Sequence, residues 1–459
     1  MYQLIVFFFI VTCLTDGVYY LWLTLLLLFP QVIHLKDTEY SDDIDLHFFI
    51  LIPCLNEEKV IYETVKNLLS LNMPNTMFII INDGSNDNTL TILKGITDSR
   101  LRILNRVLPN AQNGKGAALN DGYNTVRDII DTPRVELNNM KINDVYEDIK
   151  RIANEEGIDH SKVVLGVMDA DTFVKRSLLE KVAVIMNNDP KVGMVQTRVR
   201  IGTSTRNYFL PLMQDLEFYT FINRMQNIRE YTGTVAAAGN GQFNRLSAME
   251  MLGDEPWSQC LLEDFDFSLR LLLNGWRTRL VQDENIYQQG VISYRKFIKQ
   301  RSRWAQGCLQ CIPYIGKILK SKYLSFPGKI EVIYFMMLPW LTLLSSAALF
   351  FSWFLILYTY LHHSSVISSM LSSYHSNELL ALLIVILIIV FLPGIIFSIS
   401  YWRDTKESFY RTLLTGLFIP IYNMLQIPAV LVATFRQACG KNSWIKTDHV
   451  IDSNKTVFP

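Results

Sequence analysis

The stretch VVLGVMDAD, residues 163–171, decides the fold class of the chain. Its first six residues form a continuous apolar run, as expected of a parallel strand buried on both faces, and two aspartates close the stretch. Similar runs lie at 47–52, 77–81, 101–105 and 193–199, with helical patterns between them. This alternation predicts an α/β domain with a mostly parallel central sheet, in which ligands bind at the carboxyl ends of the strands.

The composition excludes some classes of function. Half of the 459 residues are apolar, and the excess is concentrated at the two ends of the chain. Lys plus Arg and Asp plus Glu both number 43, so the net charge indicates neither a nucleic-acid binder nor an acidic tail. The Cys308-x-x-Cys311 pair has no second pair to complete a zinc site. We expect all six scattered cysteines to be reduced thiols of a cytosol-facing protein.

Acidic residues follow two of the predicted strands. Asp83 closes the run at 77–81, and Asp169 and Asp171 close the run at 163–168. Two carboxylates at a strand end offer hard oxygen ligands to Mg²⁺ or Mn²⁺, which also holds a diphosphate. A solvated turn is the alternative. Lys115, flanked by glycines at a helix start, suits a phosphate, although an ordinary loop entering a helix has the same pattern.

Three more acids open a later helical pattern. Glu263, Asp264 and Asp266 precede apolar positions at helical spacing, and Asn274-Gly275 ends that helix. Capping and the helix dipole explain part of this acidic cluster. The other interpretation is a general base at the mouth of a site.

The two ends of the chain predict membrane segments. Residues 332–360 carry no charge, and 379–402 form a second apolar run; each exceeds a hydrocarbon core of about 30 Å. A third run, 412–435, contains Pro420 and Pro428 and either spans, or is re-entrant or interfacial. Residues 1–36 form one tilted span or a short hairpin. The amphipathic stretch 208–226 lies in the membrane plane or packs on the domain core.

The loop charges set the orientation. Basic residues precede the run at 332–360 and follow the run at 379–402, whereas the loop 361–378 has none. The positive-inside rule therefore predicts an integral protein of the plasma or cell membrane with its middle domain in the cytoplasm. The basic tail, 436–459, then belongs to the cytoplasm too. That placement requires that 412–435 does not cross the membrane as one simple span.

These motifs in order resemble a known family. Asp83-Gly84-Ser85, Gly114-Lys115-Gly116, Asp169-Ala170-Asp171, Glu263-Asp264 and the segment QRSRW at 300–304, followed by membrane runs, are similar to the family-two membrane glycosyltransferases. That family includes cellulose, chitin, hyaluronan and poly-N-acetylglucosamine synthases. The resemblance covers about residues 45–310. It implies a GT-A-like nucleotide-sugar-binding domain at 37–290, an interfacial region at 291–330 and a helical transmembrane region at 331–435.

The resemblance also implies roles for individual residues. Asp83 would contact the uracil of a UDP-sugar donor. Asp169 and Asp171 would hold the diphosphate and its Mg²⁺ or Mn²⁺, near Lys115. Asp264 would be the catalytic base, with Glu263 beside it. The residues that would close over the diphosphate and the acceptor are Gln300, Arg303 and Trp304.

Physical chemistry supports that last assignment. An Arg stabilises the charge of a departing diphosphate with paired donors, and a Trp offers a flat apolar wall to a sugar ring. Membrane anchoring accounts for Lys299 and Arg301 but not for Gln300 or Trp304. One base without a second carboxylate nucleophile implies inversion, giving a β-linked product.

The chain departs from the family pattern in several places. Leu262 stands where the family often has Thr, and the GNGQF segment at 239–243, in the place of an acceptor-pocket loop, leaves the sugar undecided. A charged insertion at about 130–161 reads as a surface elaboration. The tail segment at 442–450 resembles a Trp-x-Lys-Thr segment of relatives but ends in Asp-His.

Three functions remain open at this point. The first, which the three C-terminal apolar runs and the QRSRW segment favour, is a processive hexosyltransferase that extends a polysaccharide and exports it, with or without a partner subunit. The second is a transferase that adds one sugar to a membrane lipid. The third, an inactive assembly subunit, is disfavoured because all the acids are present.

Overall fold

The computed structural model describes residues 7, 45–73, 75–131, 158–202, 208–362, 391–392, 394–405 and 407–441. Within the second half of the helix at 326–362, the side chains of several residues are outside the description. The predicted N-terminal membrane segment, most of the insertion at 130–161, much of the run at 379–402 and most of the tail also fall outside the described residues.

A seven-stranded sheet forms the centre of the molecule, in the order β3-β2-β1-β4-β6-β5-β7. Its strands are β1 (His47–Cys54), β2 (Thr76–Asp83), β3 (Leu101–Arg106), β4 (Val163–Val167), β5 (Val192–Ile201), β6 (Gln242–Arg245) and β7 (Arg277–Gln288). All five strands predicted from the sequence are present. The sheet is mixed, because β6 runs antiparallel to both β4 and β5 whereas the other pairs are parallel.

Strands β6 and β7 were not predicted. The GNGQF segment, expected as a loop, leads into β6 instead. Gly241 has a φ of +70°, and a Cβ there would lie 2.1 Å from the Thr197 hydroxyl, so only glycine allows this close approach to β5. The short polar strand QFNR has no apolar run to reveal it.

Helices cover both faces of the sheet. Alternate residues of β1 enter two different clusters of buried side chains, with Phe48 and Ile50 on one face and Phe49 and Leu51 on the other. The first cluster includes α2 (Ile61–Ser70), α3 (Thr89–Lys94) and α7 (Arg176–Asn188), and the second includes α4 (Lys115–Asp131), α11 (Leu246–Glu250) and α12 (Glu263–Leu273). Burial on both faces explains the continuous apolar runs of the parallel strands.

The segment at 208–226 packs on the domain. It forms α9 (Phe209–Glu217) and the π-helix η2 (Phe218–Ile222), and α10 (Asn223–Thr232) continues from it. Residues 211–216 are buried, and α9 contacts β5 and α18 (Phe409–Leu417). The second of the two sequence alternatives therefore describes α9.

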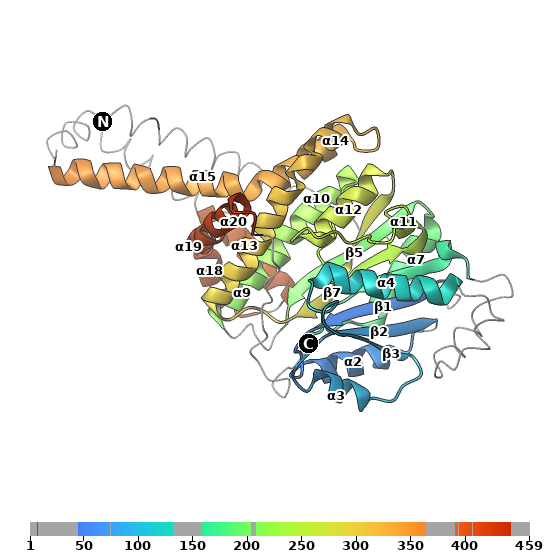
Figure 1. The fold of residues 1–459 in the computed structure, drawn as a ribbon. Helices are drawn as coiled ribbons and strands as arrows, with labels where there is room; N and C mark the ends of the chain where they lie inside the picture. The colour runs from blue at the N-terminus through green and yellow to red at the C-terminus, as the bar shows by residue number, and fades with distance from the viewer. Residues whose placement is uncertain are drawn as a thin grey trace.

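The C-terminal half adds helices around α13 (Tyr294–Cys311). A short turn at Ile312–Tyr314 and α14 (Ile315–Lys320) follow, then the 37-residue helix α15 (Phe326–His362), and residues 394–405 are helical. In Figure 1, α15 extends away from the rest of the described chain, and α18, α19 (Ile419–Leu425) and α20 (Ile427–Ala438) gather beside α13.

The run predicted at 412–435 is broken. Helix α18 and the α19–α20 segment meet at an angle of 51°. Pro420 and Pro428 each stand in the first turn of a new helix, where the missing N–H costs nothing. Among the described residues, this bent pair has the length and hydropathy of a membrane span, and no single helix has both. The run at 412–435 is therefore not one straight helix, and the expectation that it does not cross the membrane as one simple span stays a prediction.

Candidate active site

One cavity of about 400 Å³ gathers most of the predicted site residues. It is lined by the sheet and by residues of α9, η2, α10, α12, α13, α15, α19 and α20. Seven of the predicted residues line it: Lys115, Asp169, Glu263, Asp264, Gln300, Arg303 and Trp304. Asp83 and Asp171 are not among its lining residues.

Lys115 connects two sides of this cavity. It begins α4, and its Nζ donates to Asp169 Oδ1 at 2.5 Å and to the Gly239 carbonyl at 2.9 Å. Burial lowers the pKa of Lys115, but the carboxylates of Asp169 and Glu263 raise it above its usual value overall. The ammonium group therefore stays charged. It connects Asp169, which follows β4, with the turn at Gly239, and it attracts the carboxylate of Glu263 at the start of α12.

Asp264 stands in the first turn of α12 and faces the cavity. Its Oδ1 accepts the Phe265 N–H at 2.8 Å, and a Cβ on Gly239 would lie 2.9 Å from its Oδ2. Burial and the neighbouring Glu263 raise the pKa of Asp264 to about 7, although Lys115 and Arg303 act in the opposite direction. A carboxylate with such a pKa exchanges a proton near neutral pH, as a general base requires.

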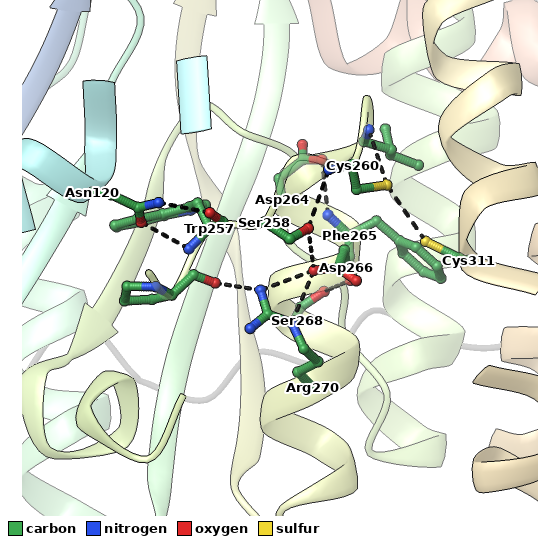
Figure 2. Close-up of polar contacts among 12 residues, drawn as sticks. Asn120, Trp257, Ser258, Cys260, Asp264, Phe265, Asp266, Ser268, Arg270 and Cys311 are labelled. Atoms are coloured by element: carbon green, nitrogen blue, oxygen red, sulfur yellow. Dashed lines mark hydrogen bonds and ion pairs between the residues drawn. The ribbon is translucent and has the colours of Figure 1, made fainter. Parts of the chain in front are cut away.

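Asp266, two residues further along α12, has a structural task (Figure 2). Its Oδ2 accepts from the Ser258 hydroxyl at 2.7 Å and from Arg270 Nε at 2.9 Å. Nearby, the Asn120 side chain bonds both the N–H and the carbonyl of Trp257, at 3.0 and 2.7 Å. These bonds fix the loop before α12 and so the start of the helix. The members of the acidic cluster thus differ in role: Asp264 faces the cavity, whereas Asp266 fixes the start of α12.

Asp83 and Asp171 are buried and are not among the residues that line the cavity. Asp83 is 5% exposed, pairs with Arg106 and accepts the Gln112 N–H at 2.9 Å. Asp171 is 3% exposed, and its Oδ2 accepts the Gln289 N–H at 2.8 Å. Each side chain therefore fixes the segment that carries it.

The Asp169 carboxylate is the candidate ligand for a metal ion that faces the cavity. Among the described residues, no group of three or more His, Cys, Asp or Glu is arranged to hold an ion. Asp169 faces the cavity with a third of its side chain exposed, and its hard oxygens suit Mg²⁺ or Mn²⁺. The Asp169 carboxylate fits such an ion in chemistry, and further ligands would come from a bound diphosphate.

Helix α13 approaches α12 through a glycine. A Cβ on Gly307 would lie 2.3 Å from the Leu262 side chain, so any larger residue would push the two helices apart. This contact, at the residue before α12, brings Gln300, Arg303 and Trp304 to the same cavity as Asp264. Helix α20 packs on α13 as well.

Arg301 is not a membrane anchor, so that interpretation of the sequence is wrong. The residue is 8% exposed and donates to both carboxylate oxygens of Glu217, at 2.9 and 2.5 Å. Tyr422, on α19, donates its hydroxyl to Glu217 at 2.7 Å and accepts from Arg301 at 3.2 Å. A buried guanidinium needs such a partner, and Glu217 lies 84 residues away in the chain.

The same guanidinium supports the ring of Trp304. Arg301 Cζ lies 4.6 Å from the centroid of that ring, and the ring meets Phe218 edge-on at 6.4 Å. Phe218 begins the π-helix η2 directly after Glu217, and π-bulges are frequent at functional sites. The wall formed by Trp304 is therefore fixed by α9, η2 and α19 together.

Sequence reasoning missed several residues of this region. Glu217 and Tyr422 lie in apolar segments, and Arg301 was explained by its place before a membrane run. Arg198, on β5, also lines the cavity. Only Gly239 carried a local signal, because it lies in the GNGQF segment.

The cysteines in the described residues are free, as expected from the sequence. The sulfur atoms of Cys260 and Cys311 lie 3.9 Å apart, and burial raises the pKa of Cys308 to about 12 (Figure 2 shows the first pair). The Cys308 thiol therefore behaves as a packing group, because the thiolate is the reactive form.

Comparisons with known proteins agree with this geometry. The family model "Glycosyl transferase family group 2" matches residues 164–397, and "Glycosyl transferase family 2" matches 49–128. A beta-monoglucosyldiacylglycerol synthase of Nostoc sp. is 28% identical over 279 residues, covering 60% of this chain and 51% of the relative. A poly-beta-1,6-N-acetyl-D-glucosamine synthase of Staphylococcus aureus is 26% identical over 258 residues, covering 56% and 53%. The chain thus spans about half the length of these relatives.

A solved structure shares the fold. The mannosyltransferase PcManGT from Pyrobaculum calidifontis, in complex with GDP-Man and Mn²⁺, superimposes with a TM-score of 0.53 at 17% identity. The match covers 95% of this chain and 99% of that one. The chain therefore has a GT-A-like glycosyltransferase fold.

Proposed function

Because the chain belongs to glycosyl transferase family group 2, we propose that it transfers a sugar from a UDP-sugar to a hydroxyl group of a membrane-bound acceptor, with inversion at the anomeric carbon. One observation carries the proposal. Asp264, with a pKa raised to about 7, faces the same cavity as Lys115, Asp169 and Arg303. A base and a set of diphosphate-binding groups therefore converge on one space.

In the proposed reaction, Asp264 takes the proton from the acceptor hydroxyl. The acceptor oxygen forms a bond to the anomeric carbon as the bond from that carbon to the UDP oxygen breaks. Lys115 and Arg303 meet the negative charge that develops on the leaving diphosphate. A single displacement with one base inverts the configuration, so an α-linked donor gives a β-linked product.

Asp169 and Asp171 would hold Mg²⁺ or Mn²⁺ together with the diphosphate. A bound ion supplies charge stabilisation to the leaving phosphate oxygens. Asp169 faces the cavity directly, whereas Asp171 does not line it and accepts the Gln289 N–H, so Asp171 would have to turn toward the cavity to reach the ion. Lys115 must release or share Asp169 when the ion binds, since it holds Asp169 Oδ1 at 2.5 Å. Asp83 would contact the uracil while paired with Arg106.

The lining of the cavity favours a lipid acceptor. Beyond Trp304 the wall is mainly apolar, and it includes Met213, Phe221, Met225, Phe335, Leu338, Leu343, Phe397, Ile419 and Val430. The alkyl chains of a lipid that enters from the bilayer stay in apolar surroundings against such a lining, whereas the hydroxyl groups of a sugar chain would lack hydrogen-bond partners there. A lipid with a hydroxyl-bearing headgroup therefore fits this wall best.

A growing polysaccharide is the second candidate. Trp304 offers a flat ring at the cavity, as sugar stacking requires, and the Staphylococcus aureus relative is named a polysaccharide synthase. In this alternative the product is extended processively and exported, with or without a partner subunit. The length of the product distinguishes the two candidates.

We place the protein in the membrane with its catalytic domain, 37–290, in the cytoplasm. Support comes from the sequence alone, in which residues 332–360 carry no charge and 379–402 form a second apolar run. The helices α18–α20 would enter the membrane from the cytoplasmic side and return, so that the tail at 436–459 stays there. Residues 1–36 and 379–402 would supply the other membrane segments, and 291–330 would lie at the membrane surface.

The experiment uses the full chain purified into lipid nanodiscs. A panel of UDP-sugars is supplied with Mg²⁺ or Mn²⁺, UDP release is measured, and the product is sized by mass spectrometry. We expect one UDP-sugar to give a product one sugar heavier than a lipid of the disc, and a chelator to abolish it. Long polymer would select the second candidate, and absence of turnover with every UDP-sugar would overturn the donor assignment.

A further inference from the structure

Two arginines on β5 differ in how their charge is neutralised. Arg198 and Arg200 are two positions apart, so their side chains leave the same face of the strand. Arg200 donates to both oxygens of Asp215 at 2.8 Å, and the Tyr401 hydroxyl donates to the same carboxylate at 2.6 Å. Arg200 is thus part of a closed, buried ion pair.

Arg198 has neutral partners instead. Its Nε donates to the Asn285 side chain at 2.8 Å, its Nη1 donates to the Gln282 carbonyl at 3.1 Å, and its Cζ lies 5.0 Å from the Tyr219 ring centroid. In the part of the chain that the structure describes, the hydrogen bonds of the Arg198 side chain go to Asn285 and Gln282 and not to a carboxylate. Asp404, Asp215 and Tyr287 act on it only at longer range.

This environment disfavours the charge of Arg198. Burial, together with the charge of Arg200, lowers the pKa of Arg198 to about 10. A guanidinium has five N–H donors, and the bonds to Asn285 and Gln282 use only two of them. An anion that binds the remaining donors would relieve the desolvation of the cation and form charge-assisted hydrogen bonds.

The position of Arg198 indicates which anion this is. Arg198 lines the same cavity as Asp264, beside Thr197 and Gln288. Tyr219, whose ring the guanidinium covers, belongs to η2, and the next residues of η2 line the apolar part of the cavity. Arg198 therefore lies where a lipid headgroup would be expected, if the alkyl chains occupy the apolar wall.

We propose that Arg198 binds a phosphate group of the acceptor, and that the acceptor is a phospholipid whose headgroup carries a free hydroxyl. The inference rests on the proposed function, because it assigns the headgroup of the same lipid acceptor. The phosphate remains attached to its lipid throughout, and the hydroxyl beyond it is the nucleophile. A neutral lipid with the same chains lacks the group that Arg198 recognises.

The first test compares two acceptors that share their acyl chains. Nanodiscs of phosphatidylcholine contain equal amounts of dioleoylphosphatidylglycerol or dioleoylglycerol, and the initial rate of sugar transfer is measured for each. We expect the anionic lipid to be preferred by roughly tenfold or more, the effect of one charge-assisted contact. Equal rates with the two lipids would overturn the inference and leave the proposed function intact.

Variants of Arg198 make the test specific. Arg198→Gln should reduce the preference for phosphatidylglycerol by roughly tenfold, and Arg198→Lys should restore part of it. Arg277→Gln is the matched control, because Arg277 lies on β7, pairs with Asp189 and is 53% exposed outside the cavity. This control should keep the preference of the wild type. A preference unchanged in a folded Arg198→Gln protein would also contradict the assignment.

A binding measurement removes the dependence on turnover. Binding of dihexanoylphosphatidylglycerol to the wild-type full chain is measured by calorimetry, and it should weaken with added salt and with Arg198→Lys. If Arg198→Gln does not fold, the wild-type lipid comparison and the lysine variant still decide the question. Failure of the proposed function looks different, because then no lipid receives a sugar in any variant.

Discussion

The two sides of the cavity are built in different ways. On the side that we propose binds the donor, called the donor side below, Lys115, Asp169 and Asp264 stand at the ends of strands or the starts of helices. On the side that we propose binds the acceptor, called the acceptor side, Arg301, Glu217 and Tyr422 come from three helices, and Tyr422 lies 205 residues from Glu217. The donor side is thus local and polar, whereas the acceptor side depends on how distant helices pack.

This difference predicts two kinds of mutational effect. Changes on the donor side should remove catalysis while the protein stays folded, because each group is carried by a rigid element. Changes on the acceptor side should affect stability and acceptor use together, because each group also holds helices to one another.

The largest effect is expected for Asp264→Asn. Loss of the proposed base should reduce the transfer rate by about 10²–10⁴-fold, measured as UDP release in the presence of acceptor. The neighbouring Asp266→Asn is the comparison, because Asp266 holds Ser258 and Arg270 rather than facing the cavity. That variant should lower the thermal stability more than the rate of the folded fraction. Near-normal transfer by a folded Asp264→Asn protein would sink the assignment of the base.

The same variant should be more stable than the wild type at neutral pH. The pKa of Asp264 is about 7 in the folded protein, above the value of about 3.9 for an unfolded aspartate. The folded state therefore holds this proton more tightly, and its stability falls as the pH rises from about 4 to 7. Removing the carboxylate removes that loss of stability. The difference in melting temperature between Asp264→Asn and the wild type should therefore increase from pH 5 to pH 8. A gap that does not depend on pH would contradict the raised pKa.

The next largest effect is expected at the ion pair of Arg301. Arg301→Gln leaves Glu217 buried without its partner, which should reduce the free energy of unfolding by about 3 kcal/mol. The ring of Trp304 loses its support at the same time, so KM for the acceptor should rise more than kcat falls. The double variant Glu217→Gln/Arg301→Gln is the control, and it should be less destabilised than the sum of the two single changes. Additive losses would show that the pair is not coupled.

The same comparison of the donor and acceptor sides explains which parts of the fold and the site could be predicted from the sequence. The apolar runs of β1, β2 and β4 were readable because a parallel strand buried on both faces needs no polar residue. The acids at the ends of these strands could be predicted as candidate site residues, because the carboxyl ends of parallel strands meet at one edge of the sheet. Strand β6 has four mainly polar residues, and its antiparallel pairing depends on Gly241 fitting against Thr197.

The acceptor side shows why the rest was hidden. Arg301 stands where basic residues commonly precede a membrane run, and nothing in the local pattern shows that it turns inward. Its direction is decided by Glu217 and Tyr422, whose neighbours in the chain are apolar. The difference between Arg198 and Arg200 could not be predicted from the sequence either, because only the fold brings Asp215 next to Arg200.

The pH dependence of the reaction tests the donor side. Asp264 acts as a base only when ionised, so kcat/KM for the donor should rise with pH and level off above about 7. One pH unit below that value the rate should be roughly tenfold lower. The fall in kcat/KM below pH 7 should be measured in buffers of constant ionic strength. The slow Asp264→Asn protein should not show this fall. If kcat/KM of that variant falls below pH 7 in the same way, the pH dependence reports the ionisation of another group and not of Asp264.

The smallest effect is expected for Tyr422→Phe, which sharpens the comparison most. The change removes one hydroxyl that donates to Glu217 and accepts from Arg301, and it keeps the ring that packs on Phe297 at 5.6 Å. The loss of stability should be about 1 kcal/mol. If α19 is coupled to the acceptor wall through this bond, KM for the acceptor should still rise while hydrolysis of the donor without acceptor stays constant. An unchanged KM would mean that the ion pair of Arg301 and Glu217 alone holds Trp304, and that α19 only packs against it.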